Sequence, residues 1–142
     1  MNIDEIEYLE KAINNEKNDS ISNLTFDKID KKKKEILEEL DLSKTKVKEL
    51  LKKLEDYRYV EEIQELQLGN FIRWINLNEP ENIELVKVGG ILCESKIEDS
   101  INLVIKNPMN RHFQINMEEN LIFQKLSDQE RVILYALDYV SK

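Results

Sequence analysis

Residues that could do catalytic chemistry are scarce in this chain. It contains one cysteine, Cys93, one histidine, His112, and three glycines. A Cys–His pair can act as nucleophile and base when a third side chain orients the base, and the spacing indicates no such residue. We therefore expect Cys93 to be buried as a small apolar side chain and His112 to lie at the rim of the fold.

The chain also has few residues that could bind a metal ion or a cofactor. One histidine and one cysteine cannot form a tetrahedral zinc site, and the paired carboxylates fall in turns or alternate across strands. Gly69 and Gly89-Gly90 match neither of the glycine fingerprints that cradle phosphates. The sequence therefore predicts a protein that is not an enzyme, with no catalytic residue, no metal and no cofactor.

Lysines are concentrated between residues 27 and 58, which hold eleven basic and nine acidic side chains in a chain of net charge -8. Lysine can neutralise nucleic-acid phosphates, so the candidate nucleic-acid contacts are Lys44, Lys46, Lys48 and Lys52. Glutamates three or four residues away favour the simpler interpretation, a solvated helix face. The acidic remainder of the chain also opposes an approach to DNA.

Aromatic and basic residues gather in a second candidate group, which consists of Tyr57, Arg58, Tyr59, Phe71, Arg73 and Trp74. Exposed aromatic rings beside arginine could stack on bases or hold a peptide. Packing in the core and rim of a small β module is the alternative. For Trp74 we expect the indole to face outward from the sheet and to be covered by a helix.

Composition favours one folded domain that lies outside the membrane. Leu, Ile, Val and Phe make up 46 of the 142 residues, which is enough apolar surface for a core. The longest apolar run, 132–137, is far shorter than the roughly 20 residues that a bilayer requires. The acidic first ten residues lack the features of a signal peptide, so we expect an intracellular, soluble protein with no membrane partner.

The N-terminal half has helical periodicity. Apolar residues at steps of three and four predict a helix over 3–13, a polar stretch over 14–22 predicts a linker, and a longer helical segment covers 28–57. The apolar stripe of that segment is Ile29, Ile36, Leu40, Val47, Leu50, Leu54 and Tyr57. The segment is either one helix of roughly 45 Å or a pair of helices broken at 41–43, where Ser43 can cap the second.

After Tyr57 the period changes to two, and turn-forming residues separate six short runs. The predicted strands are 57–63, 71–77, 85–93, 101–106, 112–117 and 121–124. Such short connections require antiparallel pairing, and six strands with one apolar face are typical of a small barrel. Gly89-Gly90 would provide the sharp bend that closes it.

A capping-box pattern at Ser127 and Glu130 predicts a terminal helix from Asp128 to about Val140 that closes one side of the sheet. The predicted fold is α+β, with an N-terminal helical arm over 1–57 and a module over 58–142 that combines a six-stranded antiparallel barrel with this helix.

Residues 35–75 are similar to winged helix-turn-helix modules. The matching features are a first helix over 35–40, a turn at 41–43, a lysine-rich recognition helix over 44–55 and a hairpin over 60–75 that would form the wing. The resemblance implies nucleic-acid binding through the lysines of the second helix. Arg58 stands where many members carry glycine, and four further strands follow the supposed wing.

Residues of about 50–142 resemble small uncharacterised proteins of nucleocytoplasmic large DNA viruses. The resemblance is carried by 57–60, 69–75, 89–91, 111–115 and 122–127. No activity is established for that family, so no residue role can be transferred from it. It implies a virion or virus-factory component of a giant virus, located in the host cytoplasm, whose partner is the capsid or another virion protein.

The leading functional interpretation is a non-enzymatic interaction and structural module, with a winged-helix nucleic-acid binder as the alternative. A protein would be bound through the apolar stripe of the arm and the lone tryptophan, so the candidate partner surface is Ile36, Leu40, Val47, Leu50, Leu54, Tyr57 and Trp74. Self-pairing of the arm as a coiled coil is left open by the sequence.

Overall fold

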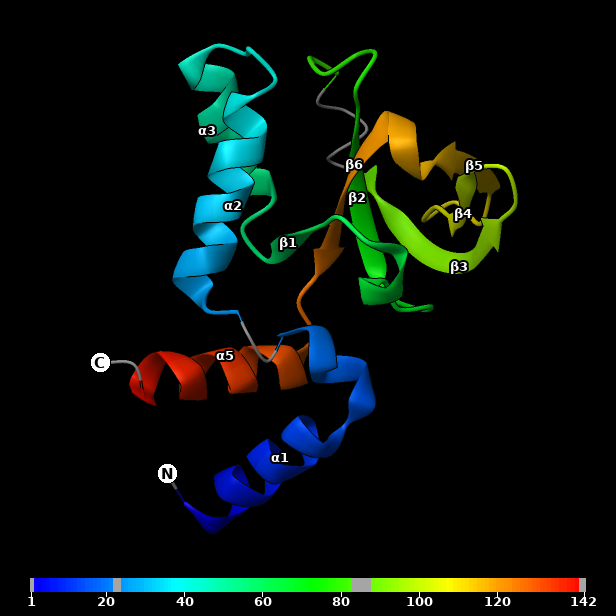
Figure 1. Cartoon of the computed structure of the whole chain (residues 1–142). Helices are drawn as coiled ribbons and strands as arrows, with labels where there is room; N and C mark the ends of the chain where they lie inside the picture. The colour runs from blue at the N-terminus through cyan, green and yellow to red at the C-terminus, as the bar shows by residue number, and fades with distance from the viewer. Residues whose placement is uncertain (1, 22–23, 83–87, 141–142) are drawn as a thin grey trace. The chain divides into compact units, whose positions relative to one another are not determined.

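The computed structural model describes residues 2–21, 24–82 and 88–140 (Figure 1). In chain order, its elements are α1 (Ile3–Asn14), η1 (Glu16–Ile21), α2 (Phe26–Glu38), α3 (Lys44–Lys53), β1 (Tyr57–Val60), η2 (Ile63–Glu65), β2 (Phe71–Asn76), β3 (Gly90–Ile97), β4 (Ile101–Lys106), β5 (His112–Asn116), η3 (Met117–Glu119), β6 (Asn120–Lys125) and α5 (Asp128–Val140), where η marks a 3-10 helix. The fold is α+β, as the sequence predicts.

The chain forms two compact units, and their division differs from the expected boundary near residue 57. The helical unit comprises Met1–Lys31 and Leu126–Lys142, and the sheet unit comprises Lys32–Lys125. Both ends of the chain therefore belong to the helical unit, and the terminal helix packs with the first one. The boundary at residue 31 falls inside α2.

The six strands of the sheet unit form one antiparallel sheet in the order β1-β6-β2-β3-β4-β5. The expected barrel is wrong, because the sheet is open and β1 and β5 are its two edges. The expected wing hairpin over 60–75 is also absent, because β6 lies between β1 and β2 and pairs with both. Four consecutive residues of β6, Leu121–Gln124, are buried, which is typical of a central strand that is covered on both faces.

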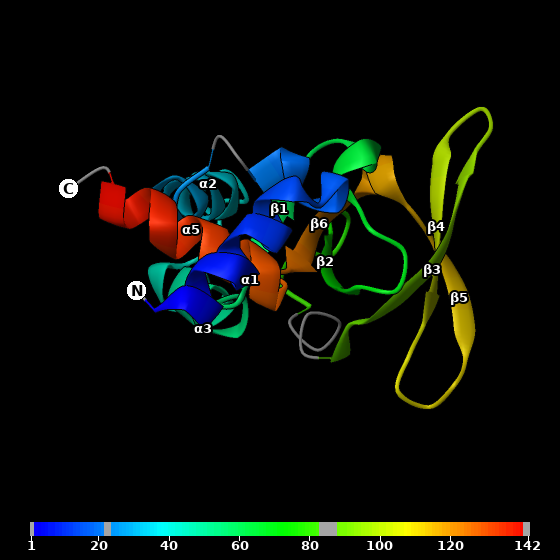
Figure 2. The ribbon, with the colours of Figure 1, turned by 90° about the horizontal axis from the view of Figure 1, so that it is seen from below.

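The third strand begins later than expected, at Gly90, and residues 85–87 of the predicted strand lie outside the described residues. Its bulge is at Cys93, where the pairing register with β4 shifts, rather than at the glycines. The glycines instead permit close approach: a Cβ at Gly90 would lie 2.5 Å from Ile105 Cγ2, and Gly89 has a positive φ of 58°. Figure 2 shows β3, β4 and β5 as one extended, twisted ribbon.

Residues 26–53 form two helices, so the alternative with a break at 41–43 is confirmed and the single 45 Å helix is wrong. Asp41 has a positive φ of 56°, and the Ser43 hydroxyl accepts a hydrogen bond from the Lys46 backbone at 3.3 Å. Lys33, which interrupts the apolar stripe, is only 2% exposed. Its ammonium donates to the carbonyls of Leu54 and Glu55, at 2.8 and 3.4 Å, and so satisfies the C-terminal end of α3.

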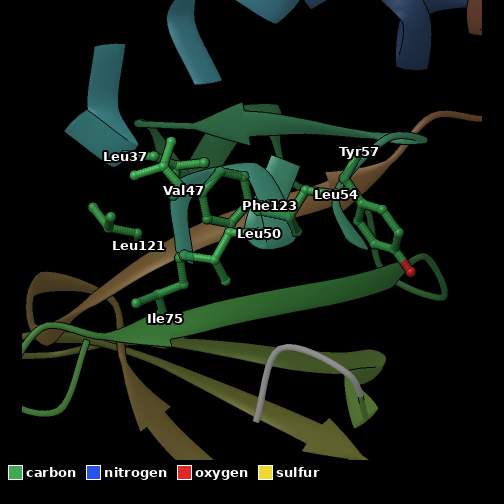
Figure 3. Packing of buried hydrophobic residues seen from close by; sticks show 8 residues of the cluster. All are labelled: Leu37, Val47, Leu50, Leu54, Tyr57, Ile75, Leu121 and Phe123. Atoms are coloured by element: carbon green, nitrogen blue, oxygen red, sulfur yellow. The ribbon is translucent and has the colours of Figure 1, made fainter. Parts of the chain in front are cut away.

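One face of the sheet is covered by this helix pair. Its buried core consists of Leu37, Val47, Leu50, Leu54, Tyr57, Ile75, Leu121 and Phe123, contributed by α2, α3 and the three strands β1, β2 and β6 (Figure 3). Burial raises the pKa of the Tyr57 phenol, Asp56 raises it further, and Arg73, whose guanidinium lies 4.8 Å from the ring centre, lowers it. The sheet unit thus supplies the second layer that an amphipathic helix pair needs.

The opposite face of the sheet is covered by its own outer strands. Here the buried residues are Ile72, Trp74, Leu92, Leu103, Ile105 and Ile122, with Phe113 packed 5.4 Å from Trp74 between ring centres. The sheet therefore folds back on itself and encloses an apolar core without closing into a barrel.

The helical unit has a smaller core, formed by Ala12, Ile21, Ile29, Leu126, Ile133 and Leu134. The expected linker over 14–22 is wrong in its middle, because 16–21 form a 3-10 helix and Ile21 is fully buried. The predicted capping box of α5 is confirmed: Ser127 Oγ accepts from the Glu130 backbone at 3.1 Å, and the Glu130 carboxylate accepts from the Ser127 backbone at 3.0 Å.

Candidate functional site

The residues expected to form a partner surface lie inside the protein. Val47, Leu50, Leu54 and Tyr57 belong to the core between the helix pair and the sheet. Ile36 and Leu40 are partly buried and pack against that core. The chain's own sheet therefore covers most of the stripe, and Ile36 and Leu40 keep part of their surface exposed.

Trp74 is buried, and the expectation for its cover is wrong. The side chain is 3% exposed in the core among β2, β3, β4 and β6, so strands cover it rather than a helix. Its neighbour Arg73 takes the other face, where it donates to the carbonyl of Lys53 and lies over the Tyr57 ring. The two side chains point to opposite faces of the sheet, as expected. Strands cover Trp74 on one face, and Arg73 packs on Tyr57 on the other.

Arg58, another member of the aromatic and basic group, is also internal. Its guanidinium donates to the Glu65 carboxylate at 3.2 Å. On the adjacent strand, the buried amide of Gln124 donates to the Glu65 carbonyl at 3.0 Å. These side chains hold η2 against the sheet.

Cys93 and His112 do not form a pair on neighbouring strands, because β4 lies between β3 and β5. Cys93 is exposed at the bulge, so the expectation of a buried thiol is wrong. Within the described residues, no group of three or more histidine, cysteine or acidic side chains is placed to hold a metal ion.

The lysines of α3 lie on its solvent side. Lys44, Lys48 and Lys52 are exposed, and Lys46 is half-buried and donates to the Glu81 carbonyl at 3.2 Å. The first three are four residues apart and follow one line along the helix. The structure therefore brings these candidate contacts together, on the helix that would be the recognition helix.

An apolar groove lies between α1 and α5, both in the helical unit. It has a volume of about 960 Å³. From the start of α1 it is lined by Asn2, Asp4, Glu5, Tyr8 and Leu9. From α5 it is lined by Val132, Tyr135, Ala136, Asp138, Tyr139 and Val140. Leu9 also packs against the core of the helical unit, so the groove lies directly over that core.

A polar junction fixes α1 and α5 at the opposite end from the groove. The Gln129 side-chain oxygen, at the start of α5, accepts hydrogen bonds from Asn15 at 2.9 Å and Asn18 at 3.0 Å. Asn18 also donates to the carbonyl of Ala12, near the end of α1. The two helices therefore run antiparallel and side by side (Figure 2), which holds the groove-lining residues at a fixed spacing.

Aromatic residues dominate the exposed part of the groove. Tyr139 is 83% exposed and Tyr135 is 64% exposed, although the Tyr135 ring also contacts Phe26 edge-on at 4.9 Å between ring centres. Tyrosine is enriched in protein interfaces because it combines a large apolar area with a polar hydroxyl. The exposed part of the groove thus combines apolar and aromatic area with phenol hydroxyl groups.

Sequence reasoning missed this groove, although α5 carried a signal for it. Between Val132 and Val140, every residue except Asp138 is apolar or aromatic, which is more than one buried face can hold. A helix that is apolar on several sides must either be central or leave apolar surface exposed, and Tyr135, Tyr139 and Val140 of α5 are exposed.

In comparisons with known proteins, no protein-family model, curated protein or solved structure matches the chain. No described helix has the length and apolar character needed to cross a membrane.

Proposed function

We propose that this protein is a non-enzymatic interaction module that binds a protein partner in the groove between α1 and α5. The observation that carries the proposal is where apolar surface is exposed. Among the described residues, seven of the thirteen exposed large apolar side chains lie on these two helices, which together contain 25 residues. Four of the seven line the groove: Tyr8, Tyr135, Tyr139 and Val140. Such concentration marks an interaction surface more often than scattered exposure does.

The architecture of the helical unit supports this assignment. In a folded domain, a helix normally packs its apolar side against a second layer of structure, as α2 and α3 pack against the sheet. In the helical unit, α1 and α5 have mainly each other and η1, and Tyr8, Tyr135, Tyr139 and Val140 remain exposed along the groove. A partner that fills the groove would remove this surface from water.

The inventory of reactive groups supports a role without catalysis. Cys93 and His112 are separated by a strand, and neither lines the groove. The groove itself is lined by side chains that bind rather than react: apolar and aromatic groups with three carboxylates and one amide.

The test is a selection of helical peptides from a display library against the full chain, with counter-selection against Tyr139→Glu. That variant places a charge in the groove at a side chain that contributes little to folding. Ile97→Glu, at an exposed apolar residue of β3, is the matched control. We expect peptides that bind the wild type and Ile97→Glu but not Tyr139→Glu. Peptides that bind all three proteins equally would refute the groove as the site.

The viral setting is a separate part of the proposal and depends on the resemblance of 57–60, 69–75, 89–91, 111–115 and 122–127 to proteins of large DNA viruses. Under this proposal the partner is the capsid or another virion protein, met in the virus factory or the particle. Mass spectrometry of purified particles, with cross-links traced to α1 or α5, tests it. Absence of this protein from both the purified particles and the virus factories would refute the viral setting.

Nucleic-acid binding through α3 is the alternative, favoured by the exposed line of Lys44, Lys48 and Lys52 after a tight helix–helix turn. The missing wing and the net charge of -8 weigh against it. We expect only weak, non-specific binding of labelled duplex at about 150 mM salt. Micromolar binding that is lost when these three lysines become alanine, and kept in Lys96→Ala, would make it the leading function.

A further inference from the structure

The rim of the groove carries one sign of charge. Asp4 and Glu5 lie on the α1 side and Asp138 on the α5 side, and no lysine or arginine lines the described groove. The surroundings are also acidic, because α1 contains four acidic side chains and one lysine. Exposed charges of one sign beside an apolar surface raise the local concentration of oppositely charged partners.

The C-terminal end of α5 also favours a positively charged partner. The last turn of a helix presents carbonyl groups without intrahelical partners, and cationic side chains are the usual way to satisfy them. The last turn of α5 contains no basic residue and does contain Asp138. A cationic group of a partner at this end of the groove would therefore lie near the free carbonyls of the helix end, while Asp4 and Glu5 supply carboxylates on the α1 side.

We propose that the groove binds an amphipathic α-helix of a partner protein, with lysine or arginine residues flanking its apolar face. This proposal rests on the proposed function and specifies the chemistry of the partner. The apolar side chains of the helix would pack on Leu9, Val132 and Ala136 between the tyrosines, and its cations would meet Asp4 and Glu5.

A helix fits the groove because α1 and α5 already form two sides of a helical layer. They contain 12 and 13 residues, which correspond to about 18 to 20 Å of helix at roughly 1.5 Å per residue. A partner helix of three to four turns can lie along both, with apolar residues at spacings of three and four.

Two other occupants fit the charge poorly. A second copy of this chain would bring its own Asp4, Glu5 and Asp138 against the same three carboxylates, and like charges at an interface oppose association. An anionic lipid surface would place phosphates against the same rim. A basic helix is the occupant that satisfies both the apolar lining and the acidic edge.

The experiment uses the full chain and three synthetic peptides of about 15 residues that share one leucine face and differ only at the flanking positions, which are Lys, Gln or Glu. Fluorescence anisotropy gives the affinity of each. We expect the Lys peptide to bind about tenfold more tightly than the Glu peptide, since each exposed ion pair contributes a factor of about 1.5 to 5. The preference should shrink between about 50 and about 500 mM salt.

Variants separate the charge from the groove. Asp4→Asn with Glu5→Gln should reduce the preference for the Lys peptide and retain binding of the Gln peptide. The matched control is Glu98→Gln with Asp99→Asn, two exposed carboxylates of the sheet unit, which should keep the preference. Circular dichroism confirms that each variant is folded.

The outcomes are distinguishable. Equal binding of the three peptides, lost in Tyr139→Glu, would overturn the preference for a basic helix and leave the proposed function in place. Failure of all three peptides to bind would overturn the proposed function as well. Dimerisation detected by light scattering and abolished by Tyr139→Glu would show that a second copy is the occupant and overturn the inference.

Discussion

The helix pairs α2–α3 and α1–α5 are both amphipathic, yet they have different surroundings. The first pair packs on a sheet, and Leu37, Leu50 and Leu54 are fully buried there. The second pair has no sheet in its core and leaves a row of tyrosines exposed. An apolar helix face therefore predicts that some structure must cover it, and a candidate partner surface is a face that the rest of the fold leaves exposed.

The largest expected effect comes from breaking the covered pair. Leu50→Ala should lower the free energy of unfolding by about 2 to 5 kcal/mol, because a fully buried leucine is replaced by a cavity. Urea unfolding of the variant and the wild type measures the difference. Leu68→Ala, at an exposed leucine of the same unit, is the control and should change stability by less than about 0.5 kcal/mol. A similar small change for Leu50→Ala would contradict the packing.

The buried lysine of the covered pair gives the next effect. Lys33→Met keeps the length of the side chain but removes the donor to the Leu54 and Glu55 carbonyls at the end of α3. We expect a loss of about 1 to 3 kcal/mol, because buried carbonyls would lose a charged partner. Thermal or urea unfolding measures it, with Lys34→Met at the adjacent exposed position as the control. Equal stability of the two variants would refute the capping role of Lys33.

A smaller effect follows from the raised pKa of Tyr57 in the same core. Burial keeps this phenol protonated in the folded state at pH values where the unfolded chain, with a tyrosine pKa near 10, has lost the proton. Folding stability is therefore fully present below about pH 10 and falls as the pH rises above it. Urea unfolding at about pH 8 and about pH 11 should show a smaller alkaline loss for Tyr57→Phe than for the wild type. An identical loss in both proteins would show that Tyr57 is not the group responsible.

The smallest expected effect lies in the uncovered pair. Tyr139→Ala should change the free energy of unfolding by less than about 0.5 kcal/mol, because the side chain is 83% exposed. The same variant should lose peptide binding, so stability and binding separate at this residue, whereas they cannot separate at Leu50. A destabilisation comparable to that of Leu50→Ala would show that the tyrosine belongs to the core and not to a surface.

Local features were predictable from the sequence because they depend on near neighbours. The capping box of α5, the Ser43 cap and the strand over 101–106 follow from residues within one turn or one strand. The candidate surface was not predictable in the same way. Periodicity identified Leu50 and Leu54 as apolar-face residues, but it could not show that β2 and β6 cover them.

The α+β class, helical structure between residues 28 and 57, the antiparallel strands and the terminal helix follow from the sequence, because hydrophobic period and capping act over a few residues. The choice between one long helix and a helix pair over 28–57 came from the structure. Only the tertiary structure decided that β6 inserts between β1 and β2, that the sheet stays open, and that α5 packs on α1. These features depend on contacts between segments far apart in the chain, such as Asn15 and Asn18 with Gln129. The local sequence pattern identifies the faces of helices and strands that need to be buried. Contacts between distant segments decide which element covers each face and which face stays exposed.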